Sequence, residues 1–314
     1  MANVILFGEP MALLIADTEG PLEDIEHFTR KMSGAEVNVS IGLSRLGHHV
    51  EYLTRLGDDP FGHYIKKALV KDHIGTEYIT LDPVYRTGIQ LKNRVTDGSD
   101  PQAPYYRKGS AASHITVSEI NQIDLSDVQL VHVTGIPPAL SQSAREATFR
   151  LVERAKENHI LVTFDPNLRP ALWENQQTMC EVINRLASMC DIFLPGVHEC
   201  EILMGSSNIE KIALYYRNLG VPITIIKDGA KGAYVAKKDS IYHVPGFKVN
   251  RIVDTVGAGD GFAVGILSGI LENLNLKDCV TRANAIGAIQ VMHVSDNEGL
   301  PTKIQLQKFL QENL

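Results

Sequence analysis

The sequence contains little cysteine, no excess of positive charge and no long apolar run. Its four cysteines, Cys180, Cys190, Cys200 and Cys279, form no C-x-x-C pair, so neither a disulfide framework nor a cysteine zinc site is expected. A net charge of −7 argues against general binding to nucleic acid or to anionic membranes. No stretch reaches the ~20 successive apolar residues that a membrane span needs. We therefore expect a cytoplasmic protein that binds neither nucleic acid nor membrane.

The length and composition predict one large α/β domain. With 314 residues, 44% of them hydrophobic, the chain can bury a large core. Short apolar runs alternate with longer helical patterns, which is typical of a mostly parallel sheet with helices on both faces and ligands at the carboxyl ends of the strands. Strands are expected near residues 4–7, 49–54, 129–134, 160–164, 192–194 and 223–227. Helices are expected near 35–46, 61–72, 141–158, 176–189 and 209–219.

The region between residues 75 and 113 breaks this alternation. It has β-rich pieces at 87–93 and 104–107, joined by a turn-rich stretch at 96–101, and no helical pattern. This predicts a small β-structured lid rather than a second domain.

The most informative stretch runs from residue 254 to 262 and reads Asp-Thr-Val-Gly-Ala-Gly-Asp-Gly-Phe. An apolar run at 262–271 follows, so the stretch is a loop that leads into a buried helix. Gly257 and Gly259 allow another group to approach the main chain closely, and the free N–H groups and dipole of the helix favour an anion there. A phosphoryl group in transfer is such an anion, and Asp260 is placed to take a proton from an attacking hydroxyl. The candidate catalytic residues are therefore Gly257, Ala258, Gly259 and Asp260.

An alternative interpretation of this stretch is an ordinary glycine-rich turn in which Asp260 caps the helix, because Asp is a preferred N-cap residue. Two better-known phosphate motifs are excluded. The dinucleotide fingerprint requires a third glycine where Phe262 stands, and it belongs near a first strand. The P-loop ends in Gly-Lys-Ser/Thr, which does not occur here.

Two separated stretches resemble the signatures of the ribokinase-like (PfkB) carbohydrate kinases. Residues 254–260 resemble the C-terminal signature, and the run Gly-Ala-Glu-Val-Asn-Val-Ser at 34–40, followed by Leu46-Gly47, resembles the N-terminal one. The resemblance covers essentially the whole chain. It implies a single ribokinase-like kinase domain over residues 1–314, with the lid inserted at about 10–32 and 76–113.

The same resemblance implies an activity and its partners. The activity is the transfer of a phosphoryl group from ATP to a carbohydrate, with the 254–260 stretch supplying the anion hole and the catalytic base. The cofactors are ATP and Mg²⁺, with a monovalent cation as an open alternative. The lid is expected to cover the sugar and to form the contact of a homo-oligomer, a dimer or larger.

Two arginines are candidates for binding an anionic substrate. Arg169 ends the loop Asp-Pro-Asn-Leu-Arg after a predicted strand, and a planar guanidinium pairs with a carboxylate or phosphate through two parallel hydrogen bonds. The alternative is a solvated loop arginine. Arg107 lies in the lid run Tyr105-Tyr106-Arg107, where the alternative is an exposed strand. Because an unpaired buried guanidinium is costly, two such arginines near the acceptor would favour an anionic substrate.

Several nucleotide positions are assigned by the resemblance. In the family the run at 225–233 lies over the nucleotide phosphates and ribose, although alone it fits a plain hairpin. The residues expected at the nucleotide are Asn167, Lys227, Gly229, Lys231, Gly232, Gly257, Gly259 and Asn284. Glu199 is expected to hold Mg²⁺ through water, and Gly196 stands where the family usually has asparagine.

Within the family, several motifs are similar to those of members that phosphorylate 2-keto-3-deoxygluconate at its 6-hydroxyl. These motifs are Gly8-Glu9-Pro10, Tyr105-Tyr106-Arg107 with Gly109-Ser110-Ala111, Asp165-x-Asn167-x-Arg169 with Leu172-Trp173, and Asp296-x-Glu298-Gly299. The residues that this resemblance places at the sugar acid are Gly34, Gln90, Tyr105, Arg107, Arg169, Asp260 and Asp296. Leu13 stands where furanose-binding relatives commonly have an aspartate, which weakens the case for fructose or ribose. The alternatives are a fructokinase or nucleoside kinase, a non-catalytic nucleotide-binding regulator and, less favoured, an NAD-dependent dehydrogenase.

Overall fold

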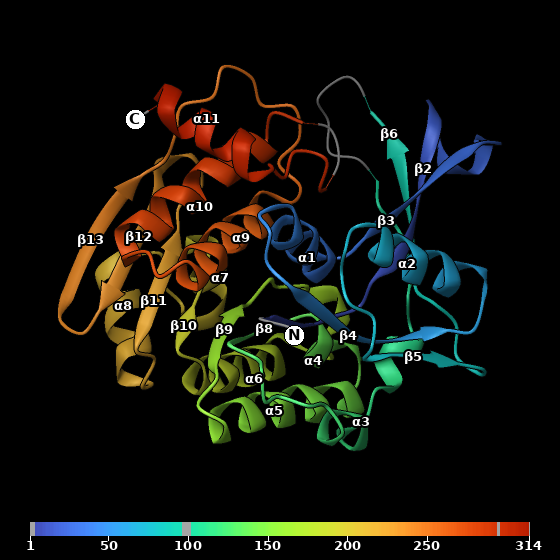
Figure 1. Ribbon diagram of the computed structural model, residues 1–314, viewed down its shortest axis with the longest axis horizontal. Helices are drawn as coiled ribbons and strands as arrows, with labels where there is room; N and C mark the ends of the chain where they lie inside the picture. The colour runs from blue at the N-terminus through green and yellow to red at the C-terminus, as the bar shows by residue number, and fades with distance from the viewer. Residues whose placement is uncertain (1–3, 96–101, 294–295, 314) are drawn as a thin grey trace.

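The computed structural model describes residues 4–95, 102–293 and 296–313, so the turn-rich stretch predicted at 96–101 lies outside the described residues. A nine-stranded sheet forms the centre of the molecule (Figure 1). Its strands are β1 (Val4–Phe7), β4 (Val50–Gly57), β5 (Ile79–Asp82), β8 (Leu130–Thr134), β9 (Leu161–Asp165), β10 (Ile192–Phe193), β11 (Ile223–Lys227), β12 (Gly232–Lys237) and β13 (Ser240–Pro245). Their order is β13-β12-β11-β10-β9-β8-β1-β4-β5. All pairs from β11 to β5 are parallel, whereas β12 and β13 are antiparallel. The predicted mostly parallel sheet is confirmed.

Helices cover both faces of this sheet (Figure 1). One face carries α1 (Ala35–Arg45), α2 (Pro60–Lys71), α9 (Ala258–Leu271), α10 (Leu276–Gln290) and α11 (Lys303–Asn313). The other carries α3 (Val117–Asn121), α4 (Pro137–Leu140), α5 (Gln142–Glu157), α6 (Gln176–Met189), α7 (Val197–Met204) and α8 (Ile209–Asn218). Short 3-10 turns lie at Leu22–Asp24, Ala111–His114, Pro170–Leu172 and Gly229–Lys231.

The apolar core consists of two layers, one on each face of the large sheet. Val4 and Leu6 of β1 belong to the first layer, and Ile5 and Phe7 belong to the second. Successive side chains of a strand point to opposite faces. A strand buried on both faces is therefore rich in apolar residues, and β1 is a continuous apolar run.

A second, four-stranded sheet lies beside the large one, at the right of Figure 1. It has the order β3-β2-β6-β7 and consists of β2 (Met11–Glu19), β3 (Phe28–Ser33), β6 (Ile89–Arg94) and β7 (Tyr105–Tyr106). The β-rich pieces predicted at 87–93 and 104–107 are β6 and β7. Of the stretch 76–113 assigned to the lid, β5 instead pairs with β4 at the edge of the large sheet.

Helices α9 and α10 pack backbone to backbone. A Cβ added to Gly265 would lie 2.2 Å from the Cα of Ala283, and one added to Gly269 would lie 2.7 Å from the Sγ of Cys279. Non-bonded carbon atoms do not approach so closely, so only glycine fits at these two positions. The loop before α9 is thereby anchored against α10.

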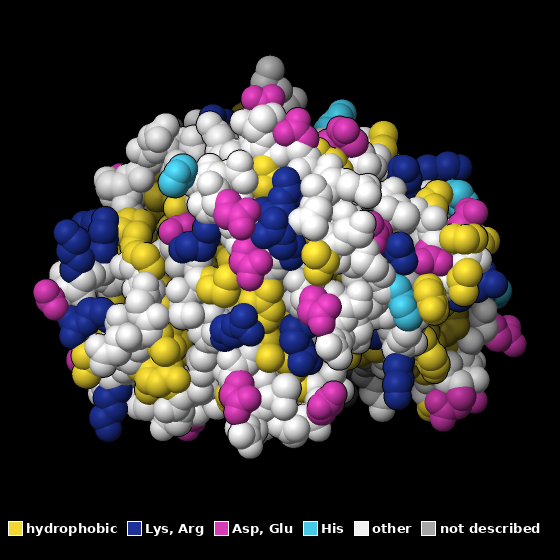
Figure 2. Space-filling model, turned by 90° about the horizontal axis from the view of Figure 1, so that it is seen from below, with side chains coloured by type: hydrophobic (Ala, Val, Ile, Leu, Met, Phe, Trp, Pro, Cys, Tyr) yellow, Lys and Arg dark blue, Asp and Glu magenta, His cyan; other side chains and the backbone are white. Residues whose placement is uncertain are grey.

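The surface carries both signs of charge. On the face below Figure 1, where α5 and α6 lie, Lys and Arg side chains alternate with Asp and Glu (Figure 2). This mixture fits the small net charge of the chain. Among the described residues, no helix is both long and apolar enough to cross a membrane.

Candidate active site

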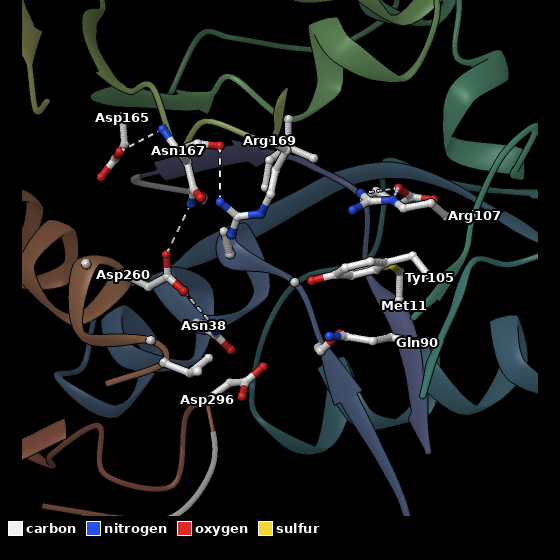
Figure 3. Close-up of a pocket in the computed structure, with 18 of the residues that line it drawn as sticks. Met11, Asn38, Gln90, Tyr105, Arg107, Asp165, Asn167, Arg169, Asp260 and Asp296 are labelled. Carbon is white, nitrogen blue, oxygen red and sulfur yellow. Dashed lines mark hydrogen bonds and ion pairs between the residues drawn. The ribbon is translucent and has the colours of Figure 1, made fainter. Parts of the chain in front are cut away.

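A polar cavity of about 410 Å³ lies between the two sheets and the start of α9 (Figure 3). This volume suits a small-molecule ligand. All seven residues expected at the sugar acid line it: Gly34, Gln90, Tyr105, Arg107, Arg169, Asp260 and Asp296. They come from strands, loops and a helix that are far apart in the sequence. Leu13 does not line this cavity; it faces a separate one with Lys31 and Tyr64.

Asp260 is a half-buried carboxylate in the first turn of α9. The N-cap position belongs to Gly257, with φ 78°, so the alternative in which Asp260 caps the helix is wrong. Instead, the amide of Asn38 donates to Oδ2 of Asp260 at 2.7 Å, and that of Asn167 lies 3.4 Å from Oδ1 (Figure 3). Burial raises the pKa of Asp260 to about 6, against the opposing effect of the Asn38 hydrogen bond. A carboxylate with such a pKa is ionised at neutral pH and basic enough to accept a proton.

Arg169 is exposed and points toward the middle of the cavity (Figure 3). Its Nη1 donates to the main-chain carbonyls of Leu168 at 3.0 Å and of Asn167 at 3.4 Å. These bonds orient the guanidinium without neutralising its charge. Arg169 therefore presents a positive charge to a ligand in the cavity.

Arg107 is buried and already paired. Its Nε donates to Oε2 of Glu9 at 2.6 Å, its Nη2 forms an ion pair with the same oxygen, and the hydroxyl of Ser110 donates to Oε1. The inference of two unpaired arginines is therefore wrong for Arg107, because Glu9 offsets its charge. Arg169 is the arginine in the cavity whose charge faces a ligand without such a carboxylate.

The wall opposite Arg107 is formed by Gln90 and Asp296. The Ser33 hydroxyl donates to Oε1 of Gln90 at 2.7 Å. Oδ1 of Asp296 lies 3.6 Å from the ammonium of Lys92, which also lies 3.3 Å from Oδ2 of Asp254. Burial raises the pKa of Asp296, although Lys92 acts in the opposite direction. Lys92 of β6 thus connects the small sheet to Asp254, at the start of the 254–260 stretch, and to Asp296.

The two glycines of the predicted anion hole differ. Gly257 has a positive φ, and a Cβ there would lie 2.1 Å from the carbonyl oxygen of Asp296. Gly259 is open, since within 4 Å its added Cβ would meet only the Nζ of Lys227, at 3.9 Å. Glycine is required at position 257 because the backbone has a positive φ and no room for a Cβ. At position 259, glycine leaves open space in the cavity.

A second cavity of about 660 Å³ lies on the other side of Gly259. Its walls include apolar side chains such as Phe247, Val249 and Ile252, which suit a flat base. The residues expected at the nucleotide that line it are Lys227, Gly229, Gly232, Gly259 and Asn284. Asn167 and Gly257 line the first cavity instead. Lys231 lies outside both linings, because its ammonium is exposed and pairs with Asp228 at 3.3 Å.

A partly buried cluster of charges lies where the two cavities meet. The ammonium of Lys227 is 2.6 Å from Oδ2 of Asp165 and 4.0 Å from Oε2 of Glu199. Burial lowers the pKa of Lys227, but the two carboxylates outweigh it, so the pKa is raised and the ammonium stays charged. Glu199 accepts hydrogen bonds from the main-chain N–H of Leu168 at 3.0 Å and of Gly196 at 2.7 Å.

Sequence reasoning gave no role to several of these groups. Asn38 lies in the N-terminal signature and Glu9 in the Gly-Glu-Pro motif, so each had a signal, but nothing in the sequence pairs Asn38 with Asp260 or Glu9 with Arg107. Asp165 belongs to the Asp165-x-Asn167-x-Arg169 motif, but the sequence does not pair it with Lys227. Ser33 has no sequence signal at all.

The chain was compared with known proteins. The family model described as pfkB family carbohydrate kinase matches residues 1–303. A 2-dehydro-3-deoxygluconokinase of Bacillus subtilis (strain 168) is 43% identical over 309 residues, which cover 98% of this chain and 95% of the relative. A 2-dehydro-3-deoxygluconokinase of Thermoproteus tenax is 32% identical over 316 residues, which cover 99% and 95%. The crystal structure of a PfkB protein from Polaromonas sp. JS666 is 40% identical, with a TM-score of 0.88 and coverage of 98% of this chain and 99% of that one.

Proposed function

This chain belongs to the pfkB family of carbohydrate kinases, and we propose that it phosphorylates 2-keto-3-deoxygluconate (2-dehydro-3-deoxygluconate) with ATP. The products are 2-keto-3-deoxy-6-phosphogluconate and ADP. The observation that carries this proposal is the cavity that holds both the half-buried Asp260 carboxylate and the guanidinium of Arg169. A sugar acid needs both groups, one for its reacting hydroxyl and one for its carboxylate.

Asp260 is the general base of the proposed reaction. It accepts the proton of the 6-hydroxyl as the oxygen attacks the γ-phosphorus of ATP. Asn38 and Asn167 fix its two oxygens by donating to them. These neutral donors hold the carboxylate in place, and burial keeps its pKa at about 6.

The start of α9 is the proposed anion hole. The first N–H groups of a helix have no acceptor within it, and the positive end of the helix dipole adds to them. Of residues 257–259, Ala258 already donates to the main-chain carbonyl of Thr255 at 3.3 Å. Negative charge that develops on the transferring phosphoryl group is stabilised there. Gly259 leaves room for the phosphoryl group because its added Cβ would project into open space beside Lys227.

The sugar acid lies in the first cavity with its carboxylate at Arg169 and its 6-hydroxyl at Asp260. Arg107, Tyr105, Gln90, Gly34 and Asp296 complete the wall. Because Glu9 offsets the charge of Arg107, we assign recognition of the carboxylate mainly to Arg169. The nucleotide lies in the second cavity against Gly229, Gly232 and Asn284.

Mg²⁺ fits this site only as an ion that arrives with ATP. Among residues 4–95, 102–293 and 296–313, no three His, Cys, Asp or Glu side chains form a metal-binding group, and Mg²⁺ in kinases is bound by water, phosphates and one or two carboxylates. Glu199 is the residue proposed to hold it through water. When bound, the ion neutralises charge on the phosphates.

A coupled assay of ADP release tests the proposal against fructokinase activity. Purified protein is offered 2-keto-3-deoxygluconate, fructose, ribose and gluconate at equal concentrations with Mg-ATP. The sugar acid is expected to give the highest kcat/KM. A preference for fructose would replace the proposed substrate, and ADP release with none of the sugars would favour the nucleotide-binding regulator.

Sedimentation of the same sample tests whether the protein forms the oligomer expected through the small sheet.

A further inference from the structure

The two cavities of the active site meet at only two of the described residues, Lys227 and Gly259. A phosphoryl group that passes from a nucleotide in one cavity to a hydroxyl in the other must cross this junction. A Cβ on Gly259 would lie 3.9 Å from the Nζ of Lys227, so the ammonium lies directly beside the open glycine of the anion hole.

The junction has a surplus of negative charge that only a cation can offset. Asp165, Glu199 and Asp260 all line the first cavity, and each would repel an arriving phosphoryl group. Lys227 lies at 2.6 Å from Asp165 and at 4.0 Å from Glu199. An ammonium has three N–H donors, and the hydrogen bond to Asp165 uses one of them.

Resting on the proposed kinase function, we propose that Lys227 is a catalytic residue whose ammonium contacts the transferring γ-phosphoryl group. Asp165 holds the side chain in position for this contact. The family resemblance places Lys227 at the nucleotide only in general terms. Here the side chain itself stabilises the reacting group.

The step balances without a change in the protonation of Lys227. The 6-oxygen of the sugar acid forms a bond to the γ-phosphorus while its proton passes to Asp260. The bond from the γ-phosphorus to the bridging oxygen breaks, and its electron pair leaves with ADP. Lys227 gives up no proton and forms no bond; its charge is closest to the phosphoryl oxygens when their negative charge is greatest.

The test must distinguish two roles of the Lys227 ammonium, which are contact with the phosphoryl group and neutralisation of Asp165. Lys227→Met alone leaves a buried carboxylate without its partner, and such a loss can unfold a protein. The double variant Asp165→Asn/Lys227→Met removes both charges and keeps an oxygen to accept from the N–H of Asn167. Asp165→Asn alone is the matched control. If the double variant does not fold, Lys227→Gln replaces Lys227→Met in the same background.

Two measurements are made on the folded variants. Calorimetry compares the affinities for Mg-ADP and for the Mg complex of a β,γ-imido analogue of ATP, which differ by the γ-phosphoryl group. Steady-state assays give kcat for whichever sugar of the panel the wild type phosphorylates best.

The double variant is expected to bind ADP within about threefold of wild type, to bind the imido analogue at least ~10-fold more weakly, and to lose ~10²-fold or more in kcat, as for the loss of an oxyanion-hole donor. Wild-type kcat in the double variant would overturn the proposal, because Lys227 would then serve only to neutralise Asp165. Equal loss of affinity for both nucleotides would also overturn it, since the contact would then be to the α- or β-phosphate. A wild type without kinase activity would refute the proposed function alone, while selective loss of analogue binding would still support the contact.

Discussion

The carboxylate of Glu9 holds the guanidinium of Arg107, a residue 98 positions later in the chain, with 2.6 Å between Oε2 and Nε. Glu9 is 1% exposed and Arg107 is 7% exposed. The pair joins the end of β1 to the small sheet. It makes Arg107 a structural residue as well as a residue of the cavity wall.

Replacing Arg107 is expected to lower the stability of the protein. Arg107→Met leaves Glu9 buried with only the Ser110 hydroxyl as a donor, and breaking a buried ion pair typically costs about 3–5 kcal/mol. Urea denaturation should show this loss. The double variant Glu9→Gln/Arg107→Met should recover most of the stability; failure to recover it would mean that the pair is not the reason for the loss.

Replacing Arg169 is expected to affect substrate use alone. The side chain is exposed and bonds only to loop carbonyls, so Arg169→Ala should change the free energy of unfolding by no more than ~0.5 kcal/mol. Loss of a charge-assisted hydrogen bond should lower kcat/KM for the sugar acid by roughly one to two orders of magnitude. Activity toward a neutral sugar should barely change. If both activities fall in proportion, Arg169 does not bind the carboxylate.

The role of Asp260 as the base should determine how kcat/KM depends on pH. Asp260 acts in its ionised form, and its pKa is raised to about 6, so kcat/KM should fall tenfold per pH unit below about 6. It should be level above that pH. Asp260→Asn should lower kcat by ~10²-fold or more while ATP affinity stays near that of wild type. A variant that keeps most of its turnover would exclude Asp260 as the base.

The two glycines of the anion hole provide a matched pair of variants. Gly259→Ala should fold normally, because the added Cβ meets only the Nζ of Lys227 within 4 Å, yet kcat should drop by ~10²-fold if the phosphoryl group needs that space. Gly257→Ala forces φ 78° on alanine and places its Cβ 2.1 Å from the carbonyl oxygen of Asp296, so its thermal midpoint should fall. Unchanged kcat in a folded Gly259→Ala would exclude the anion hole at this position.

The stability of the protein should depend on pH through Glu36, and this effect is separate from catalysis. It is fully buried, with Oε1 bonded to the Thr134 hydroxyl, and burial raises its pKa from 4.5 to about 7. The folded state therefore binds the proton more tightly than the unfolded state, so this group's contribution to stability is complete below pH 4.5 and is lost as pH rises to about 7. Compared with Glu36→Gln, the wild type should lose about 3 kcal/mol between pH 4.5 and 7. Denaturant titrations of both proteins at the two pH values measure their free energies of unfolding. An equal change in both proteins between the two pH values would contradict the prediction.

Much of the fold was predictable because its signals are local. The apolar run at 4–7 is β1 and the mostly apolar run at 223–227 is β11, since strands buried on both faces are rich in apolar residues. The helix expected at 262–271 begins four residues earlier, at Ala258, because its first turn has the sequence of a glycine loop. The predicted ribokinase-like fold is confirmed by the match to the Polaromonas structure. The lid role of the small sheet and the residue roles in the site stay predictions.

What could not be predicted are the pairings across the chain. Asn38 and Asp260 are 222 residues apart and meet at 2.7 Å, and no sequence pattern encodes such a contact. The raised pKa of Asp260 also depends on burial by surrounding elements. The pairing of Arg107 could not be predicted for the same reason, because only the fold brings Glu9 next to its guanidinium.

The contact between α9 and α10 has a consequence for the choice of phosphate donor. A side chain at Gly265 or Gly269 would collide with Ala283 or Cys279, so α9 and α10 pack closely and their relative movement is restricted. The span from Asn284 on α10 to Gly259 on α9 is therefore restricted in the same way. If the nucleotide binds at Asn284 as proposed, its phosphate chain must span this distance to reach the sugar hydroxyl, so we expect the length of the phosphate chain to contribute to the choice of donor.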